Sequence, residues 1–199
     1  MGMNRFPLEK FATVELNQVA FPKTGMVVSQ TPLGAEFTES APCENGMWVS
    51  ADKANGVIKS VATVADSPVG IVYTSEKEYD PYHYGLKTFG RKVAGDYPRV
   101  GILGLGDTIT SNCLQYDDTE FQAVTVGDNQ KTSEQVLIEA LEKDLTVAAN
   151  TLYVALVANS PVPKITKTKP GSGTYAKITK YYTVPNGEKG VKYQIVSLG

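Results

Sequence analysis

The sequence holds few of the residue types on which catalytic and metal sites usually depend. Its 199 residues include one histidine, His83, and two cysteines, Cys43 and Cys113. Because no CxxC pair or Cys/His cluster is present, we predict no zinc site, and no cofactor of any other kind. We expect the two cysteines to be free buried thiols, and a bridge between them stays open as the alternative.

Long apolar runs and an excess of one charge are also missing. No apolar run is long enough to span a bilayer, and the first residues, MGMNRFPLEKF, lack the apolar region of a secretory signal. The formal net charge of −2 offers no broad attraction to nucleic acid or to anionic lipid. These absences predict a protein that does not bind membranes, and they disfavour nucleic acid as a partner.

Motifs for chemistry are missing as well. The glycines of GILGLGDT follow the order GxxGxG, no GK[ST] comes after them, and strand-like residues follow, so they predict a turn and not a phosphate-binding loop. His83 lies between two tyrosines with no carboxylate in a recognisable relation to it. The acidic residues Asp117, Asp118 and Glu120 lack calcium-loop spacing and indicate a solvated turn. We therefore predict no enzymatic activity and no catalytic residues.

The dominant pattern is one of short β-branched runs separated by turn residues, from Gly25 to Val126. It predicts a mainly β fold, a small β-barrel or sandwich (β-tulip-like). Asn45-Gly46 and Asn55-Gly56 are the strongest turn signals, and the second predicts a hairpin. The run LYVALVA, Leu152 to Ala158, predicts a buried strand.

One short helix is expected from Thr132 to Leu145. Thr132 or Ser133 can cap its start, and Glu139 and Lys143 have the spacing of an i,i+4 pair. Its apolar face is predicted to consist of Val136, Leu137, Ala140 and Leu141.

Charge is unevenly placed along the chain. Residues 160–199 hold seven lysines and one glutamate, a net charge of +6, so the remainder carries −8. A basic end on an acidic body suggests contact with an acidic surface, and a solvated pair of strands with lysine on the exposed side is the alternative. Alternating Tyr and Lys in this segment leaves a third alternative, stacking on single-stranded nucleic acid, which no motif supports.

Composition divides the chain into three parts. Residues 1–24 are predicted to form an extended N-terminal arm, residues 25–159 a β-rich core domain, and residues 160–199 a basic C-terminal β-hairpin or meander extension. For the arm, a strand docked on its own domain is the alternative. The polar and aromatic excursion from Glu76 to Pro98 predicts an interaction surface, or a loop folded back over the end of the barrel.

One stretch resembles the head-decoration proteins of tailed bacteriophages, the lambda-type family and related capsid cement proteins, and a second stretch is similar to segments of phage structural proteins. In the first stretch, a glycine-led strand, a short hairpin, a small-residue stretch and a P-x-G-I step follow one another. The segments that carry the resemblance are Gly46 to Val49, Asn55-Gly56, Ala62 to Ala65, Pro68 to Ile71 and, as the second stretch, Tyr97 to Asn112. The lysine-rich end and the tyrosine-rich loop are departures from the lambda-type pattern.

The resemblance implies a structural virion protein without enzymatic activity. Such a protein is made in the cytoplasm of the bacterial host, binds the outer capsid surface and staples neighbouring subunits of the major capsid protein. Self-association, as a homotrimer or another homo-oligomer on the shell, stays open, as does a tail, fibre or head–tail joining role. The residues expected to contact the shell or a partner are the aromatic residues of the arm and the loop: Phe6, Phe11, Phe21, Tyr79, Tyr82 and Tyr84.

Overall fold

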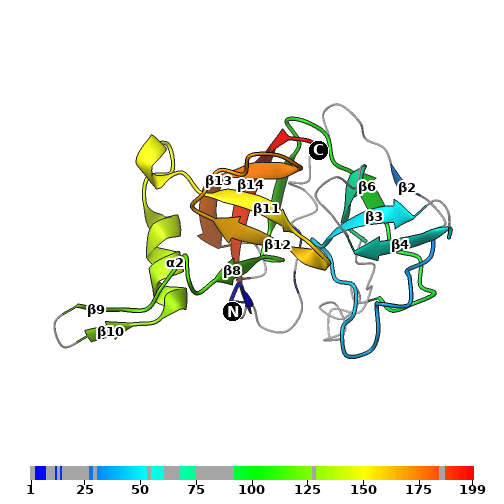
Figure 1. Cartoon of the computed structure of the whole chain (residues 1–199), viewed down its shortest axis with the longest axis horizontal. Helices are drawn as coiled ribbons and strands as arrows, with labels where there is room; N and C mark the ends of the chain where they lie inside the picture. The colour runs from blue at the N-terminus through cyan, green and yellow to red at the C-terminus, as the bar shows by residue number, and fades with distance from the viewer. Residues whose placement is uncertain are drawn as a thin grey trace.

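A computed structural model shows a mainly β fold, with three sheets and one short α-helix among the residues that it describes (Figure 1). No sheet in this described part closes into a barrel. The predicted β-rich class is confirmed. The structure describes residues 3–7, 12, 14, 27–28, 31–52, 55–60, 68–74, 92–126, 129–183 and 187–199.

The largest sheet has seven strands and combines both ends of the described chain. Its β12–β8 pair is parallel, and every other neighbouring pair is antiparallel. The strands, in spatial order, are β1 (Met3–Arg5), β8 (Gln115–Asp117), β12 (Ser160–Thr166), β11 (Tyr153–Val157), β13 (Tyr175–Thr183), β14 (Lys189–Ser197) and β7 (Thr108–Ser111).

The segment after residue 159 is therefore not an appended extension, contrary to the prediction. Strands β12, β13 and β14 are all interior strands of the seven-stranded sheet. Ile165, Ile178 and Tyr193, one from each of these strands, are buried in the main core. Their apolar side chains explain the difference, because a solvated hairpin would not bury one face of each strand.

The second sheet has five strands, all antiparallel. The predicted Asn55-Gly56 hairpin is confirmed as the turn between β3 and β4, and Gly56 has a positive φ of 63°. In spatial order the strands are β2 (Val27–Val28), β6 (Val100–Ile102), β5 (Val69–Val72), β3 (Trp48–Asp52) and β4 (Val57–Ser60).

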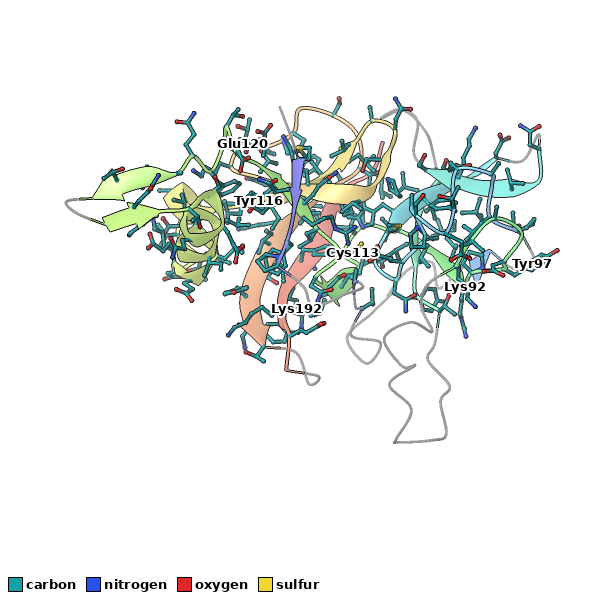
Figure 2. The ribbon with its side chains drawn as sticks, turned by 90° about the horizontal axis from the view of Figure 1, so that it is seen from below. Lys92, Tyr97, Cys113, Tyr116, Glu120 and Lys192 are labelled. Atoms are coloured by element: carbon teal, nitrogen blue, oxygen red, sulfur yellow. The ribbon has the colours of Figure 1, made fainter. Side chains whose placement is uncertain are left out.

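The third sheet is a two-stranded hairpin, β9 (Val124–Val126) with β10 (Asn129–Lys131), and it leads into the helix α2 (Ser133–Glu142). In both views it projects beyond α2 at one end of the molecule (Figures 1 and 2). A 3₁₀ turn, η2 (Ala148–Asn150), precedes β11.

The helix starts where the sequence predicts. The Thr132 hydroxyl accepts a hydrogen bond from the Gln135 amide, and the Gln135 side-chain oxygen accepts one from the Thr132 amide, which forms a capping box. Leu137 and Leu141 are buried, as expected for the apolar face. Two details differ: the helix ends at Glu142 and not at Leu145, and Glu139 pairs with Lys131, at 2.7 Å, instead of Lys143.

The two larger sheets share the main core. Trp48 of β3 and Tyr193 of β14 are fully buried, their ring centroids lie 6.1 Å apart, and the indole N–H donates to the tyrosine hydroxyl at 3.4 Å. Burial raises the pKa of Tyr193, which keeps its hydroxyl neutral. Apolar packing in this shared core thus joins the five-stranded sheet to the seven-stranded one.

Candidate interaction surface

Of the six aromatic residues expected to contact a partner, the structure describes only Phe6. Its ring is 1% exposed and packs edge-on against Tyr181, with the centroids 6.3 Å apart. The docked-strand alternative therefore holds for residues 3–7, because β1 pairs with β8 and the chain itself covers the Phe6 ring. Phe6 is thus removed as a contact residue. The other five, Phe11, Phe21, Tyr79, Tyr82 and Tyr84, lie outside the described residues, as does His83.

The GILGLGDT stretch is the turn that carries the chain from β6 in one sheet to β7 in the other. Gly106 has a φ of +91°, and the Asp107 carboxylate accepts a hydrogen bond from the Gly104 amide at 2.6 Å. Asp107 is fully buried, and its second oxygen has no hydrogen-bond partner in the described part of the chain. Burial raises the pKa of Asp107, against the opposing effect of the Gly104 N–H. This arrangement is that of a turn, as predicted.

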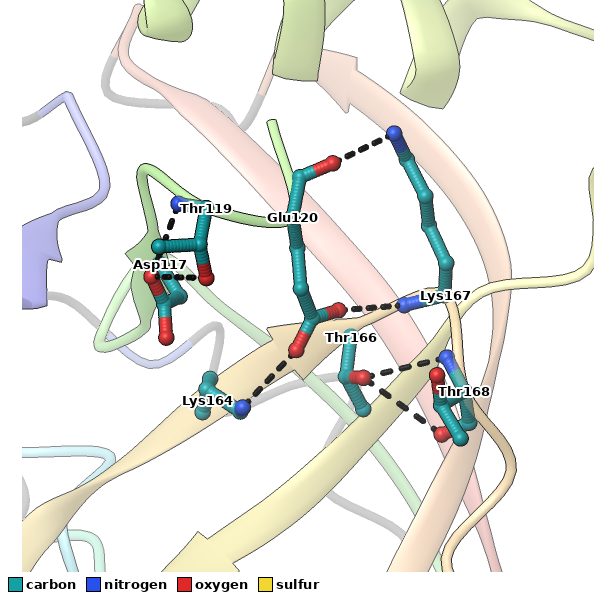
Figure 3. Close-up of polar contacts among 7 residues, drawn as sticks. All are labelled: Asp117, Thr119, Glu120, Lys164, Thr166, Lys167 and Thr168. Carbon is teal, nitrogen blue, oxygen red and sulfur yellow. Dashed lines mark hydrogen bonds and ion pairs between the residues drawn. The ribbon is translucent and has the colours of Figure 1, made fainter. Parts of the chain in front are cut away.

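The acidic cluster begins at Asp117, the last residue of β8, and continues into the predicted turn, which contacts the region of β12 (Figure 3). Asp117 accepts two hydrogen bonds from Thr119, and Glu120 binds Lys164 at 2.8 Å and the Lys167 amide at 2.9 Å. Burial opposes ionisation of Glu120, but the hydrogen bonds from Lys164, Thr166 and Lys167 outweigh it and lower its pKa. Within the cluster, Glu120 is thus paired with a lysine, while Asp117 is held by Thr119.

Both cysteines are free and buried in the second core cluster. Burial raises the pKa of both thiols, that of Cys113 to about 12, so neither is a thiolate at neutral pH. Among the described residues, no three His, Cys, Asp or Glu side chains are grouped so that they could hold a metal ion.

A basic surface lies on the outward side of the β13–β14 hairpin. In β14 the inward residues Val191, Tyr193 and Ile195 are buried, while Lys192 between them points outward. Lys180 of β13 is the direct cross-strand partner of Lys192, and Lys177 is the partner of Gln194. We call the three outward lysines, Lys177, Lys180 and Lys192, the lysine face; Figure 2 labels Lys192 on the hairpin.

A β-bulge creates this grouping. The register shifts between Ile178 and Lys180, so that Lys177 and Lys180 share one side of the sheet although they are three residues apart. Tyr182 belongs to the same side, where its hydroxyl shares a hydrogen bond with Thr110 at 2.8 Å. The Lys180 ammonium lies 5.4 Å from the centre of the Tyr182 ring, a cation–π contact. The sequence shows the lysines, but it gives no sign of the bulge.

A groove of about 400 Å³ runs between this hairpin and the end of α2. Glu142 and Asp144 lie on its helix side, and Lys180 and Lys189 lie on its strand side. Burial, followed by the charges of Glu142 and Glu134, raises the pKa of Tyr181. The groove therefore carries both signs of charge, and it shares Lys180 with the lysine face.

Comparison with known proteins identified no match. No protein-family model, no curated protein and no solved structure matched the chain. Within the described residues, no helix combines the length and the apolar character that crossing a bilayer requires.

Proposed function

We propose that this protein is a structural virion protein that binds the outer surface of a phage capsid and stabilises contacts between neighbouring major capsid protein subunits. The observation that supports the proposal is the strand pattern from Gly46 to Val72, which resembles that of capsid cement proteins. In the structure this segment supplies β3, β4 and β5, which lie side by side in the order β5-β3-β4. In the P-V-G-I step, Pro68 directly precedes β5, and the other three residues are the first residues of that strand.

The projecting β9–β10 hairpin supports a role in assembly. A two-stranded hairpin is marginally stable alone, and this one is outside the two large sheets. Its described side chains include Val124, which is 43% exposed, and Thr125, which is also exposed. Contact with a neighbouring subunit would cover these side chains and stabilise the hairpin.

A cement protein acts by burying surface across the seam between capsomers. Each square ångström of apolar surface buried there contributes roughly 25 cal/mol, before the cost of association is subtracted. Separation of capsomers would then require breaking these contacts as well. Because a shell carries many copies, modest contacts of each copy add up over the particle.

The direct test is co-sedimentation with expanded heads assembled from the major capsid protein of the same phage, prepared without decoration. We expect saturable binding and a higher temperature of head disruption, with already decorated heads as the control that binds no further protein. An absence of binding together with an unchanged disruption temperature would refute the proposal. Electron microscopy with a labelled protein gives its location, and label confined to tails or to the head–tail junction would favour the other virion roles.

A further inference from the structure

We propose that the lysine face of the β13–β14 hairpin is a docking surface for an acidic patch on a protein partner. The inference deepens the proposed function, because it names the side of the molecule that would meet the shell, and only the partner's identity rests on that function. Three observations support the inference: the register of the hairpin, the ion pairs elsewhere in the chain and the contacts of the neighbouring tyrosines.

The register places two equal charges directly opposite each other. Lys180 and Lys192 are cross-strand partners on the outward side, and like charges in such positions repel and destabilise a sheet. No carboxylate of the described residues forms an ion pair with Lys177, Lys180 or Lys192. An arrangement that costs stability in the isolated chain becomes favourable when carboxylates of a partner lie between the two lysines.

The ion pairs that join described residues leave out the three lysines of this face. Glu120 binds Lys164, Glu44 binds Arg5, and Asp52 binds Lys59. The segment that holds the lysine face carries +6 while the remainder of the chain carries −8. The molecule therefore has a basic area of limited extent on an acidic body, and this suits a bounded acidic patch.

Nucleic acid fits this surface less well than an acidic protein does. A polynucleotide carries charge at regular short intervals and would continue from the lysine face onto the acidic body. Its bases would also need free aromatic faces on which to stack. The Tyr182 hydroxyl is bonded to Thr110 and its ring contacts Lys180, while Tyr181 is partly buried against Phe6. What the surface offers is three flexible point charges, which match a cluster of carboxylates.

The test compares two double variants of equal net charge. Lys180→Gln with Lys192→Gln removes the opposed pair, and Lys131→Gln with Lys169→Gln is the matched control, because both of its lysines lie outside the lysine face. The probes are a fluorescein-labelled glutamate homopeptide and a labelled oligothymidine of the same charge, titrated at low salt and read by fluorescence anisotropy.

We expect the Lys180/Lys192 variant to bind the homopeptide about tenfold more weakly than the wild type, and the control to bind within about twofold of it. The variant's melting temperature should equal or exceed that of the wild type, because a repulsive pair has been removed. A merely structural role of the two lysines predicts the opposite shift in melting temperature.

Three results would overturn the inference: equal weakening in both double variants, tighter binding of oligothymidine than of the homopeptide, or no binding of the homopeptide by the wild type. Co-sedimentation with undecorated heads separates this inference from the proposed function. If the Lys180/Lys192 variant binds heads as the wild type does, the inference fails and the function stands. If the wild type does not bind heads while its homopeptide binding depends on the two lysines, the proposed function is wrong and the inference about the lysine face is retained.

Discussion

Gly46 occupies a position that only glycine fits, at the junction of the two large sheets. Its φ is +90°, and its amide donates to the Val72 carbonyl at 2.8 Å. A Cβ atom at this position would collide with the Ser111 hydroxyl and would come within 2.5 Å of the Cys113 Cβ. Both atoms are in or beside β7, so Gly46, which precedes β3, allows the two sheets to approach closely here.

We therefore predict that Gly46→Ala lowers the free energy of unfolding by about 3 kcal/mol, through backbone strain and overpacking combined. Gly56→Ala is the control, because Gly56 also follows an asparagine and has a positive φ, but its Cβ would meet open space. That control should lose only about 1 kcal/mol. Urea denaturation followed by circular dichroism measures both, and equal losses would contradict the packing explanation.

Asp107 is predicted to make stability depend on pH in an unusual direction. Since its pKa is raised in the folded state, the native protein holds this proton more tightly than the unfolded chain does. The contribution of Asp107 to the free energy of unfolding therefore falls as the pH rises from its unfolded-state pKa through its folded-state pKa. Asp107→Asn keeps an oxygen for the Gly104 amide and removes the buried charge, so it should stabilise the protein at neutral pH by about 1 kcal/mol.

The advantage of Asp107→Asn should vanish at a pH below both pKa values, where the wild-type carboxyl is protonated. Asp107→Ala is the control for the turn itself, because it loses the hydrogen bond to Gly104 and should destabilise at every pH. Thermal melts across the acidic range give the comparison. A destabilising effect of Asp107→Asn at neutral pH would show that the ionised carboxylate has partners in the folded protein.

At the level of elements, the turn after β8 is joined to β12 by Glu120, and this contact gives the opposite pH dependence. The folded-state pKa of Glu120 is lowered, so its stabilisation is present above the unfolded pKa and is lost as the pH falls through the folded one. Glu120→Gln should destabilise by about 1 kcal/mol at neutral pH, since the group remains partly solvated, and the difference should shrink in acid.

A matched control for Glu120 is Glu142→Gln, which removes an exposed carboxylate from the last turn of α2. Its effect should stay within about 0.5 kcal/mol at all pH values. Denaturant titrations at neutral and acidic pH measure both variants. A Glu120→Gln effect that does not change with pH would show that the side chain stabilises the fold through its packing and not through its charge.

The elements that could be predicted from sequence are those fixed by local chemistry. Asn55-Gly56 requires positive φ at a tight turn, and the cap at Thr132 together with the spacing of Leu137 and Leu141 defines the helix. Strand pairing is different, because β8 lies beside β12 and β7 beside β14, between residues far apart in the chain. Alternation specifies which side of a strand is apolar, but it does not specify the neighbour.

The candidate surface could be predicted only in part, for the same reason. The excess of lysine after residue 159 is visible in the sequence, and it suggested an acidic partner. The bulge between Ile178 and Lys180 sets which lysines meet, and it depends on the pairing of β13 with β14. For Phe6, the sequence predicted an aromatic ring that a partner would bury, but the ring is buried by its own chain.

At the scale of the whole molecule, residues 160–199 are part of the fold and not a separable tail. Removing them would take three interior strands from the main sheet and expose the core around Trp48. We predict that a chain ending at Asn159 does not fold cooperatively, which a flat thermal melt and collapsed amide dispersion in NMR would show. A chain ending at Ser197, the last residue of β14, is the control and should melt cooperatively.

A cooperative melt of the chain ending at Asn159 would instead mean that the remaining strands form an independent domain. If the prediction holds, deletion cannot be used to find what the basic segment binds, because loss of binding would follow from loss of the fold. Point variants such as those of the lysine face avoid this ambiguity.

The pairing of β7 with β14, and of β1 with β8, also has a kinetic consequence. Each pair closes a long stretch of intervening chain, and folding slows as the sequence separation between contacting residues grows. During synthesis, β7 and β8 leave the ribosome long before β12 and β14, the partners that complete their pairing. Because their apolar sides lack these partners in the interval, we expect the nascent polypeptide to be prone to aggregation until synthesis is complete.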